Sequence, residues 1–148
     1  MILTSRNSEI KPSTRFAYTL RALVDLALRQ GTGPVTVAAI AKRQGIPVRS
    51  LEQLFNRLRH KGIVEAERGP RGGYRLKLPA QKIRVRTLFE MFEPSGKGRS
   101  ASAILAGPNG DNDPAKLIWQ QIQKAVETSL EAVTLAQLVD RFRDRLEE

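Results

Sequence analysis

Residues 36–78 read TVAAIAKRQGIPVRSLEQLFNRLRHKGIVEAERGPRGGYRLKL, and this stretch decides the fold. Its apolar spacing predicts a short helix over residues 37–44, with Ile40 facing inward. Thr36 can accept a hydrogen bond from the first turn of this helix, and Gly45 supplies the left-handed backbone position that commonly ends one. The stretch is therefore predicted to begin with a helix that is capped at both ends.

A second helix is predicted over residues 48–61, because large apolar residues recur at three and four positions and Gly62 closes it. These residues are Leu51, Leu54, Phe55 and Leu58. Pro47 stands at its start, where a serine would have offered a capping oxygen. Another helix with one apolar face precedes both, over residues 14–29. Three helices of which the last two share a short glycine turn predict a helix-turn-helix.

From Ile63 the apolar period changes from three or four to two. Apolar residues alternate with charged ones on both sides of the sequence Gly-Pro-Arg-Gly-Gly at residues 69–73. This pattern predicts a basic β-hairpin with a glycine-rich tip. The predicted fold class is mainly α with a small β-hairpin wing, that is, a winged helix-turn-helix domain followed by a long helix.

The rest of the chain divides into segments of different composition. Residues 1–13 form an N-terminal extension, and residues 14–92 form the winged helix-turn-helix domain, which ends in a short helix near Phe92. Residues 93–114, rich in Pro, Gly, Ser, Asn and Asp, are predicted to be an exposed loop. In residues 115–148 the apolar spacing predicts two further helices, a long one up to residue 133 and a shorter one after it.

Composition excludes several classes of function. The 148 residues include no cysteine, so disulfides, thiolate metal ligands and cysteine nucleophiles are excluded. No apolar run approaches the length of a membrane span and the N-terminus lacks a secretory pattern, so we expect no membrane partner and a cytoplasmic location. Phosphate-binding and dinucleotide glycine motifs are missing, as are paired histidines, so the protein is not predicted to be an enzyme.

The net charge of +10 is unevenly distributed. Residues 1–86 carry 18 Lys and Arg against 5 Asp and Glu, whereas residues 87–148 carry 7 against 10. A strongly basic half suits a polyanion, because each Lys or Arg placed on a phosphate releases condensed counterions. We therefore expect duplex DNA as the partner of the first half, with a basic membrane surface as the weaker alternative.

The solvent side of the helix over residues 48–61 carries the side chains that duplex recognition needs. A carboxylate can accept from the cytosine amino group, a glutamine can bond an adenine edge in bidentate fashion, and an arginine can fork onto guanine. The hairpin tip adds arginines beside glycines that let the backbone approach a phosphate wall. The predicted DNA-binding residues are Arg49, Ser50, Glu52, Gln53, Asn56, Arg57, Arg59, His60, Arg68, Gly69 and Arg71.

The run Ser50-Leu51-Glu52-Gln53-Leu54-Phe55-Asn56-Arg57-Leu58-Arg59, with Gly62-Ile63-Val64 and Arg68-Gly69-Pro70-Arg71-Gly72-Gly73-Tyr74, resembles the IscR-like (Rrf-two) family of bacterial winged helix-turn-helix transcription regulators. The resemblance covers residues 14–92 well and residues 115–142 loosely. It implies that Glu52 and Gln53 read bases and that Arg68 with Gly69 enters the minor groove.

The resemblance also implies a homodimeric repressor whose two copies read the halves of a palindromic operator. The long helix after the loop would join the copies, and its apolar positions are too many for an isolated helix to leave in water. The predicted dimer interface consists of Leu117, Ile118, Ile122, Ala125, Val126 and Leu130.

One family feature is missing from the chain. Iron-sulfur members hold a cluster with three cysteines and a histidine, at places that fall here on Ala101, Gly107, Asp113 and Lys116. Such a cluster needs soft thiolate donors, which these residues do not provide. We therefore predict that the protein binds no metal and no cofactor. An effector, either a small molecule or a protein, stays possible, and the sequence does not identify it.

Two alternatives stay open at this point. The chain could be a cysteine-depleted variant of an iron-sulfur-sensing regulator, or a winged-helix module that binds RNA or another protein. A protein-binding module would expose an apolar or acidic surface on the helix over residues 48–61, whereas this one is basic and polar.

Overall fold

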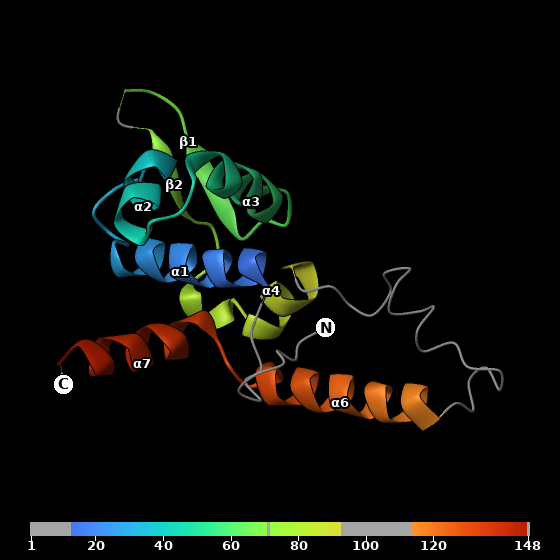
Figure 1. The fold of residues 1–148 in the computed structure, drawn as a ribbon. Helices are drawn as coiled ribbons and strands as arrows, with labels where there is room; N and C mark the ends of the chain where they lie inside the picture. The colour runs from blue at the N-terminus through green and yellow to red at the C-terminus, as the bar shows by residue number, and fades with distance from the viewer. Residues whose placement is uncertain (1–12, 71, 93–113, 148) are drawn as a thin grey trace.

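The computed structural model describes residues 13–70, 72–92 and 114–147. The predicted extension and loop lie outside these residues, apart from Ser13 and Pro114. In chain order the elements are α1 (Thr14–Leu28), α2 (Val37–Gln44), α3 (Val48–His60), β1 (Val64–Glu67), β2 (Gly73–Leu76), the 3-10 helix η1 (Ala80–Lys82), α4 (Val85–Phe92), α6 (Pro114–Glu131) and α7 (Leu135–Glu147). Figure 1 shows α2, α3 and the hairpin on one side of α1, with α6 and α7 on the other.

The helix ends confirm the capping predictions. Thr36 Oγ1 accepts a hydrogen bond from the Ala39 N–H at 3.1 Å, and Gly45 ends α2 in the left-handed conformation at φ 63°. Pro47 begins α3 without a side-chain cap. The Ser13 side chain caps α1 by accepting from the Phe16 N–H at 3.2 Å. The turn between α2 and α3 is therefore set by local chemistry, which is why it could be read from the sequence.

The core gathers around α1 and the inner face of α3. Leu51, Leu54, Phe55 and Leu58 are at most 5% exposed, as their spacing predicts. The other face of α1 is covered by α4 and α7, so this helix is buried on nearly every side. On the α4 side, the rings of Phe16 and Phe89 meet edge to face, with 5.6 Å between their centroids.

The hairpin is antiparallel, with Val64 opposite Leu76 and Glu67 opposite Gly73. It is anchored at two points that the sequence did not reveal. Val35 and Tyr74 exchange two backbone hydrogen bonds, of 2.9 and 2.7 Å, which adds a third short segment to the sheet. The Tyr74 ring also packs on Phe55 of α3, with 4.8 Å between centroids. Gly73 is required here, because a Cβ would lie 2.5 Å from the Val35 carbonyl oxygen.

The segment that follows α6 packs against the winged-helix domain. Residues 83–85 pair with residues 133–135, where the Val85 N–H donates to Val133 and the Leu135 N–H donates to Ile83, at 2.9 and 2.8 Å. Leu135 and Val139 then complete the core beneath α1. We therefore place α7 with the predicted domain of residues 14–92. In the described part of the chain, no helix is both long and apolar enough to cross a membrane.

Candidate nucleic-acid interface

Helix α3 has one buried and one polar face. Seven of the eight predicted residues on it are exposed, and Ser50 is half-buried. The side chains of Glu52 and Gln53 make no hydrogen bond or ion pair within the part of the chain that the structure describes. Their oxygens and the Gln53 amide therefore face solvent and can bond an outside group.

The end of α3 is more self-contained. Arg59 Nη2 donates to Asn56 Oδ1 at 3.0 Å, and His60 Nδ1 lies 2.7 Å from the Asn56 carbonyl oxygen. These contacts tie three of the predicted DNA-binding residues to one another, although all three remain exposed. The first half of α3 thus offers the side chains with fewer hydrogen bonds inside the described chain.

Arg57 contacts another helix, although its position in the sequence places it on the solvent side of α3. Its Nη2 donates to the Met91 carbonyl oxygen at 2.9 Å, and its guanidinium lies 4.7 Å from the centroid of the Phe92 ring. Both partners belong to α4, and Met91 is 34 residues along the chain from Arg57. The guanidinium is held against α4 as a fixed positive charge.

The wing places its basic groups in two settings. Arg75 is paired inside the hairpin, with its Nε 2.9 Å from Glu65 Oε1 and its Nη2 on Glu67. Arg68 and Gly69 are exposed next to the tip, and Gly69 adopts a φ of 113° that glycine accepts readily. Arg71 lies outside the described residues. Of the described arginines in the hairpin, Arg68 is the one without an internal partner.

A buried ion pair fixes α2, and through the turn α3, against α1. The Asp25 carboxylate is 2% exposed and accepts from Arg43 Nη2 at 2.7 Å and from Arg43 Nε at 3.0 Å. Gln44 Nε2 adds a third hydrogen bond at 2.8 Å. Burial alone would raise the pKa of Asp25, but these hydrogen bonds and the charges of Arg43 and Arg29 outweigh it and lower the pKa below its usual value.

Helix α6 carries most of the predicted dimer interface on an uncovered side. Leu117, Ile118 and Ile122 are 53%, 55% and 43% exposed, and Ala125 is exposed as well. Val126 is half-buried, and Leu130 packs against the core of its own chain. The last two residues of the predicted interface therefore face inward more than the first four.

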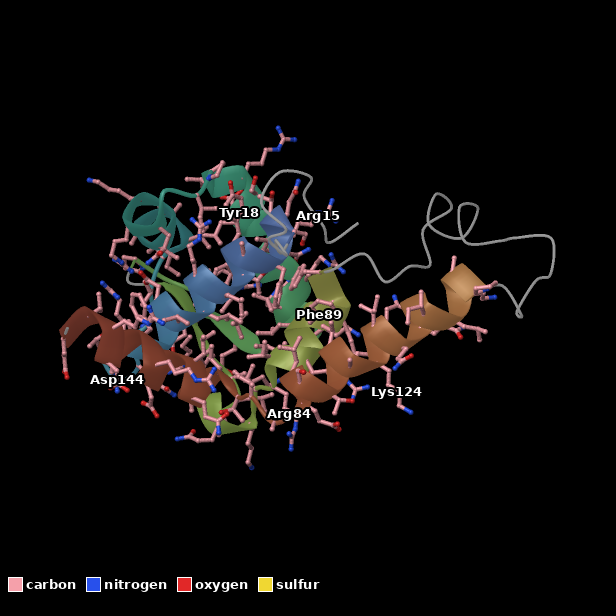
Figure 2. The ribbon with its side chains drawn as sticks, turned by 60° about the horizontal axis from the view of Figure 1, so that its bottom comes forward. Arg15, Tyr18, Arg84, Phe89, Lys124 and Asp144 are labelled. Atoms are coloured by element: carbon pink, nitrogen blue, oxygen red, sulfur yellow. The ribbon has the colours of Figure 1, made fainter. Side chains whose placement is uncertain are left out.

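Arginines attach α6 to the rest of the molecule. Arg86 of α4 pairs with Glu90 on its own helix at 2.9 Å and with Glu127 and Glu131 of α6 at 3.5 and 3.3 Å. Arg84 Nη1 donates to the Glu131 carbonyl oxygen at 2.7 Å, and Figure 2 shows Arg84 at the junction of α4 with the end of α6.

A helix-turn-helix with a polar, basic reading face and a β-hairpin with an exposed arginine beside its tip defines the class of winged-helix transcription regulators. The chain belongs to the Rrf2 family, whose model is described as iron-dependent transcriptional regulator and matches residues 12–141. The resemblance predicted from the motifs is thereby confirmed, as is the fold class.

Relatives and solved structures agree with this assignment. The IscR regulator of Cereibacter sphaeroides is 39% identical over 136 residues, which cover 88% of this chain and 87% of that protein. Among solved structures, T. potens IscR superimposes with a TM-score of 0.73 at 34% identity and covers 89% of this chain and 88% of its own. CymR, the global cysteine regulator of B. subtilis, does so with a TM-score of 0.70 at 30% identity, covering 90% and 98%.

The residues of this chain do not fit an iron-sulfur cluster. The sequence has no cysteine, and its single histidine, His60, lies on α3 against Asn56. Among the described residues, no group of three His, Asp or Glu side chains could hold a metal ion. Lys116, one of the four family positions, offers an ammonium group, which is not a ligand, while Ala101, Gly107 and Asp113 lie outside the described residues.

Proposed function

We propose that this protein is a sequence-specific DNA-binding repressor that acts as a homodimer on a palindromic operator without an iron-sulfur cluster. The observation that carries the proposal is the division of α3 into an apolar face that is buried in the core and a polar face that is largely exposed to solvent. Glu52 and Gln53 stand on that polar face without partners in the described chain. Both side chains match base edges in the major groove.

The wing supports the same function from a second element. Tyr74 fixes the hairpin to both Val35 and α3, so the position of Arg68 relative to α3 is set by the fold. A helix in the major groove with an arginine beside it at the neighbouring backbone or minor groove is the docking geometry of winged helices. We propose that Arg68 and Gly69 make that second contact.

The homodimer is proposed from α6. Three large apolar side chains on one of its sides are about half exposed. A second copy of the same helix would cover them, and a two-fold axis would present two α3 helices to two equal half-sites. A dimer bound across a promoter would exclude polymerase, and repression is proposed on that ground.

Selection of genomic fragments with the purified full chain tests the proposal. The bound fragments should share a palindrome whose half-sites are about one helical turn, or a multiple of it, apart. A double variant, Glu52→Ala with Gln53→Ala, should lose the preference while keeping non-specific binding. Equal binding to RNA of the same sequence at fixed salt, or fragments without a shared motif, would contradict sequence-specific duplex recognition.

A further inference from the structure

A cleft of about 410 Å³ opens between the beginning of α1 and the polar face of α3. Two arginines line it, Arg15 from α1 and Arg57 from α3, together with side chains that can donate a hydrogen bond. The latter are Thr14, Tyr18, Ser50 and Gln53, and the apolar Leu54 completes the lining. Within the described residues, no carboxylate lines the cleft. Two guanidinium groups among hydrogen-bond donors, with no carboxylate beside them, favour an anion over a cation.

The two arginines differ in how they are held. Arg57 is fixed by Met91 and Phe92, and one hydrogen bond to a carbonyl leaves most of its five donors free. Arg15 is exposed, and its side chain makes no hydrogen bond or ion pair among the residues that the structure describes. The held guanidinium of Arg57 on one wall and the exposed guanidinium of Arg15 on the other can bind an anion from two sides.

Tyr18 follows Arg15 by about one turn of α1 and lines the same cleft. Its ring lies 5.4 Å from the guanidinium carbon of Arg21, and the residue is half-buried. The ring therefore has a preferred place, and its hydroxyl is available as a donor. Figure 2 shows Arg15 and Tyr18 together near the beginning of α1.

The location identifies the anion. Ser50 and Gln53 belong both to the wall of the cleft and to the polar face of α3, so the cleft opens on the surface that would meet DNA. In Figure 1 the wing extends beyond α3 at the top, whereas the beginning of α1 lies below α3 near α4. A duplex whose major groove holds α3 has a phosphate backbone on each side of that helix.

From these observations we infer that the α1–α3 cleft binds a backbone phosphate of the operator, with Arg15, Tyr18 and Arg57 as its ligands. The contact would fix the register of α3 in the groove from the side opposite the wing, and it would carry no sequence information itself. This inference rests on the proposed function and assigns the α1 residues a role that the motifs did not suggest.

The first test measures the affinity of Arg15→Ala for a selected operator duplex and for a scrambled duplex at several salt concentrations. Losing one charged contact should weaken both duplexes about tenfold, by similar factors, and flatten the salt slope by about one unit. Tyr18→Phe should weaken both by a smaller factor. Arg141→Ala is the matched control, since Arg141 is exposed on α7 on the far side of α1, and it should change little.

The second test replaces single operator phosphates by neutral methylphosphonates. At one position in each half-site the neutral linkage should weaken wild-type binding about as much as Arg15→Ala does. Combining it with Arg15→Ala should then add less than about twofold, because both changes remove the same contact. Additive losses at every position would overturn the inference.

Other outcomes separate this inference from the function on which it rests. If wild type binds the operator and Arg15→Ala binds equally well, the cleft is not a phosphate site and the proposed function stands. If wild type binds no duplex, the proposed function itself fails. If a sugar phosphate at constant ionic strength displaces the operator from wild type but not from Arg15→Ala, the cleft belongs to a small phosphorylated ligand, and the assignment to the DNA backbone is wrong.

Discussion

Asp25 is the residue on which the placement of the helix-turn-helix depends most. It is a carboxylate among the buried apolar residues of α1, and its three hydrogen bonds reach Arg43 and Gln44 at the end of α2. A buried charge of this kind is tolerated only with partners, so the pair holds α2 at one place on α1. Loss of the carboxylate would leave Arg43 facing an apolar helix.

Asp25→Asn is expected to lower the free energy of unfolding by about 2 to 3 kcal/mol, at the low end for a broken buried pair because Arg43 is 33% exposed. Chemical denaturation at neutral pH measures the loss. Asp140→Asn, an exposed carboxylate on α7, is the control and should stay within about 0.5 kcal/mol of wild type.

The same pair predicts a pH dependence. Because the folded pKa of Asp25 is lowered, its contribution is complete above the unfolded value near 3.8 and is lost as the pH falls through the folded value. The stability difference between wild type and Asp25→Asn should therefore shrink below about pH 4. A difference that stays constant between pH 6 and pH 3 would contradict the role of the charge.

At the scale of elements, we propose that α3 and the wing divide the work of recognition. Glu52 and Gln53 point from a rigid helix, as base reading requires. Arg68 sits next to a glycine tip on a hairpin anchored through Tyr74, which suits positioning on the backbone or in the minor groove. Removing side chains from α3 should therefore change the base preference, whereas removing Arg68 from the wing should change the overall affinity for DNA.

Gln53→Ala should relax the preference at one base pair of the operator by about 1 to 3 kcal/mol and leave the others unchanged. Arg68→Ala should instead weaken all sequences and flatten the salt slope by about one unit. A panel of single-base operator variants, titrated with each protein, separates the two patterns. Identical effects of both substitutions across the panel would refute the division.

The elements themselves were largely predictable from the sequence, and their contacts were not. Apolar periodicity and the caps at Thr36 and Gly45 placed the first three helices within about two residues, because those signals are local. The Val35–Tyr74 bridge, the docking of α7 on α1 and the contact of Arg57 with Phe92 join distant segments. Periodicity shows which face of an element is apolar, but not which element covers it.

In the candidate site too, the local features could be predicted from the sequence and the contacts between elements could not. The exposed side of α3 was foreseen from the spacing of Leu51, Leu54, Phe55 and Leu58. The α1–α3 cleft was missed, because Arg15 and Tyr18 read as ordinary polar positions on an amphipathic helix. Only the packing of α1 against α3 brings them beside Ser50.

For the whole molecule, α4 contacts both α3, the proposed reading helix, and α6, the proposed dimer helix. It holds Arg57 of α3 through Met91 and Phe92, and it holds α6 through Arg86. A dimer formed through α6 would therefore set the distance between its two α3 helices through two α4 helices. Half-site spacing in the operator should follow from this geometry.

Ile118→Asp combined with Ile122→Asp should yield a monomer in sedimentation and weaken operator binding strongly, because both side chains are about half exposed on the uncovered side of α6. Gln120→Asp, exposed on the same helix off the apolar stripe, is the control and should remain dimeric. An unchanged mass for the double variant would rule out α6 as the interface. Leu130 is a poor choice for this test, since it packs on its own core.

The last expectation concerns iron, which the family description names and this chain has no thiolate to hold. After anaerobic incubation with ferrous iron and sulfide, followed by desalting, the protein should be colourless, and its operator affinity should be unchanged. His60→Asn, which removes the one imidazole, separates weak binding at α3 from binding elsewhere, because only the former would disappear. A chromophore with stoichiometric iron that alters operator affinity would show that this chain senses iron through hard donors, and the proposal of a cluster-free regulator would then be wrong.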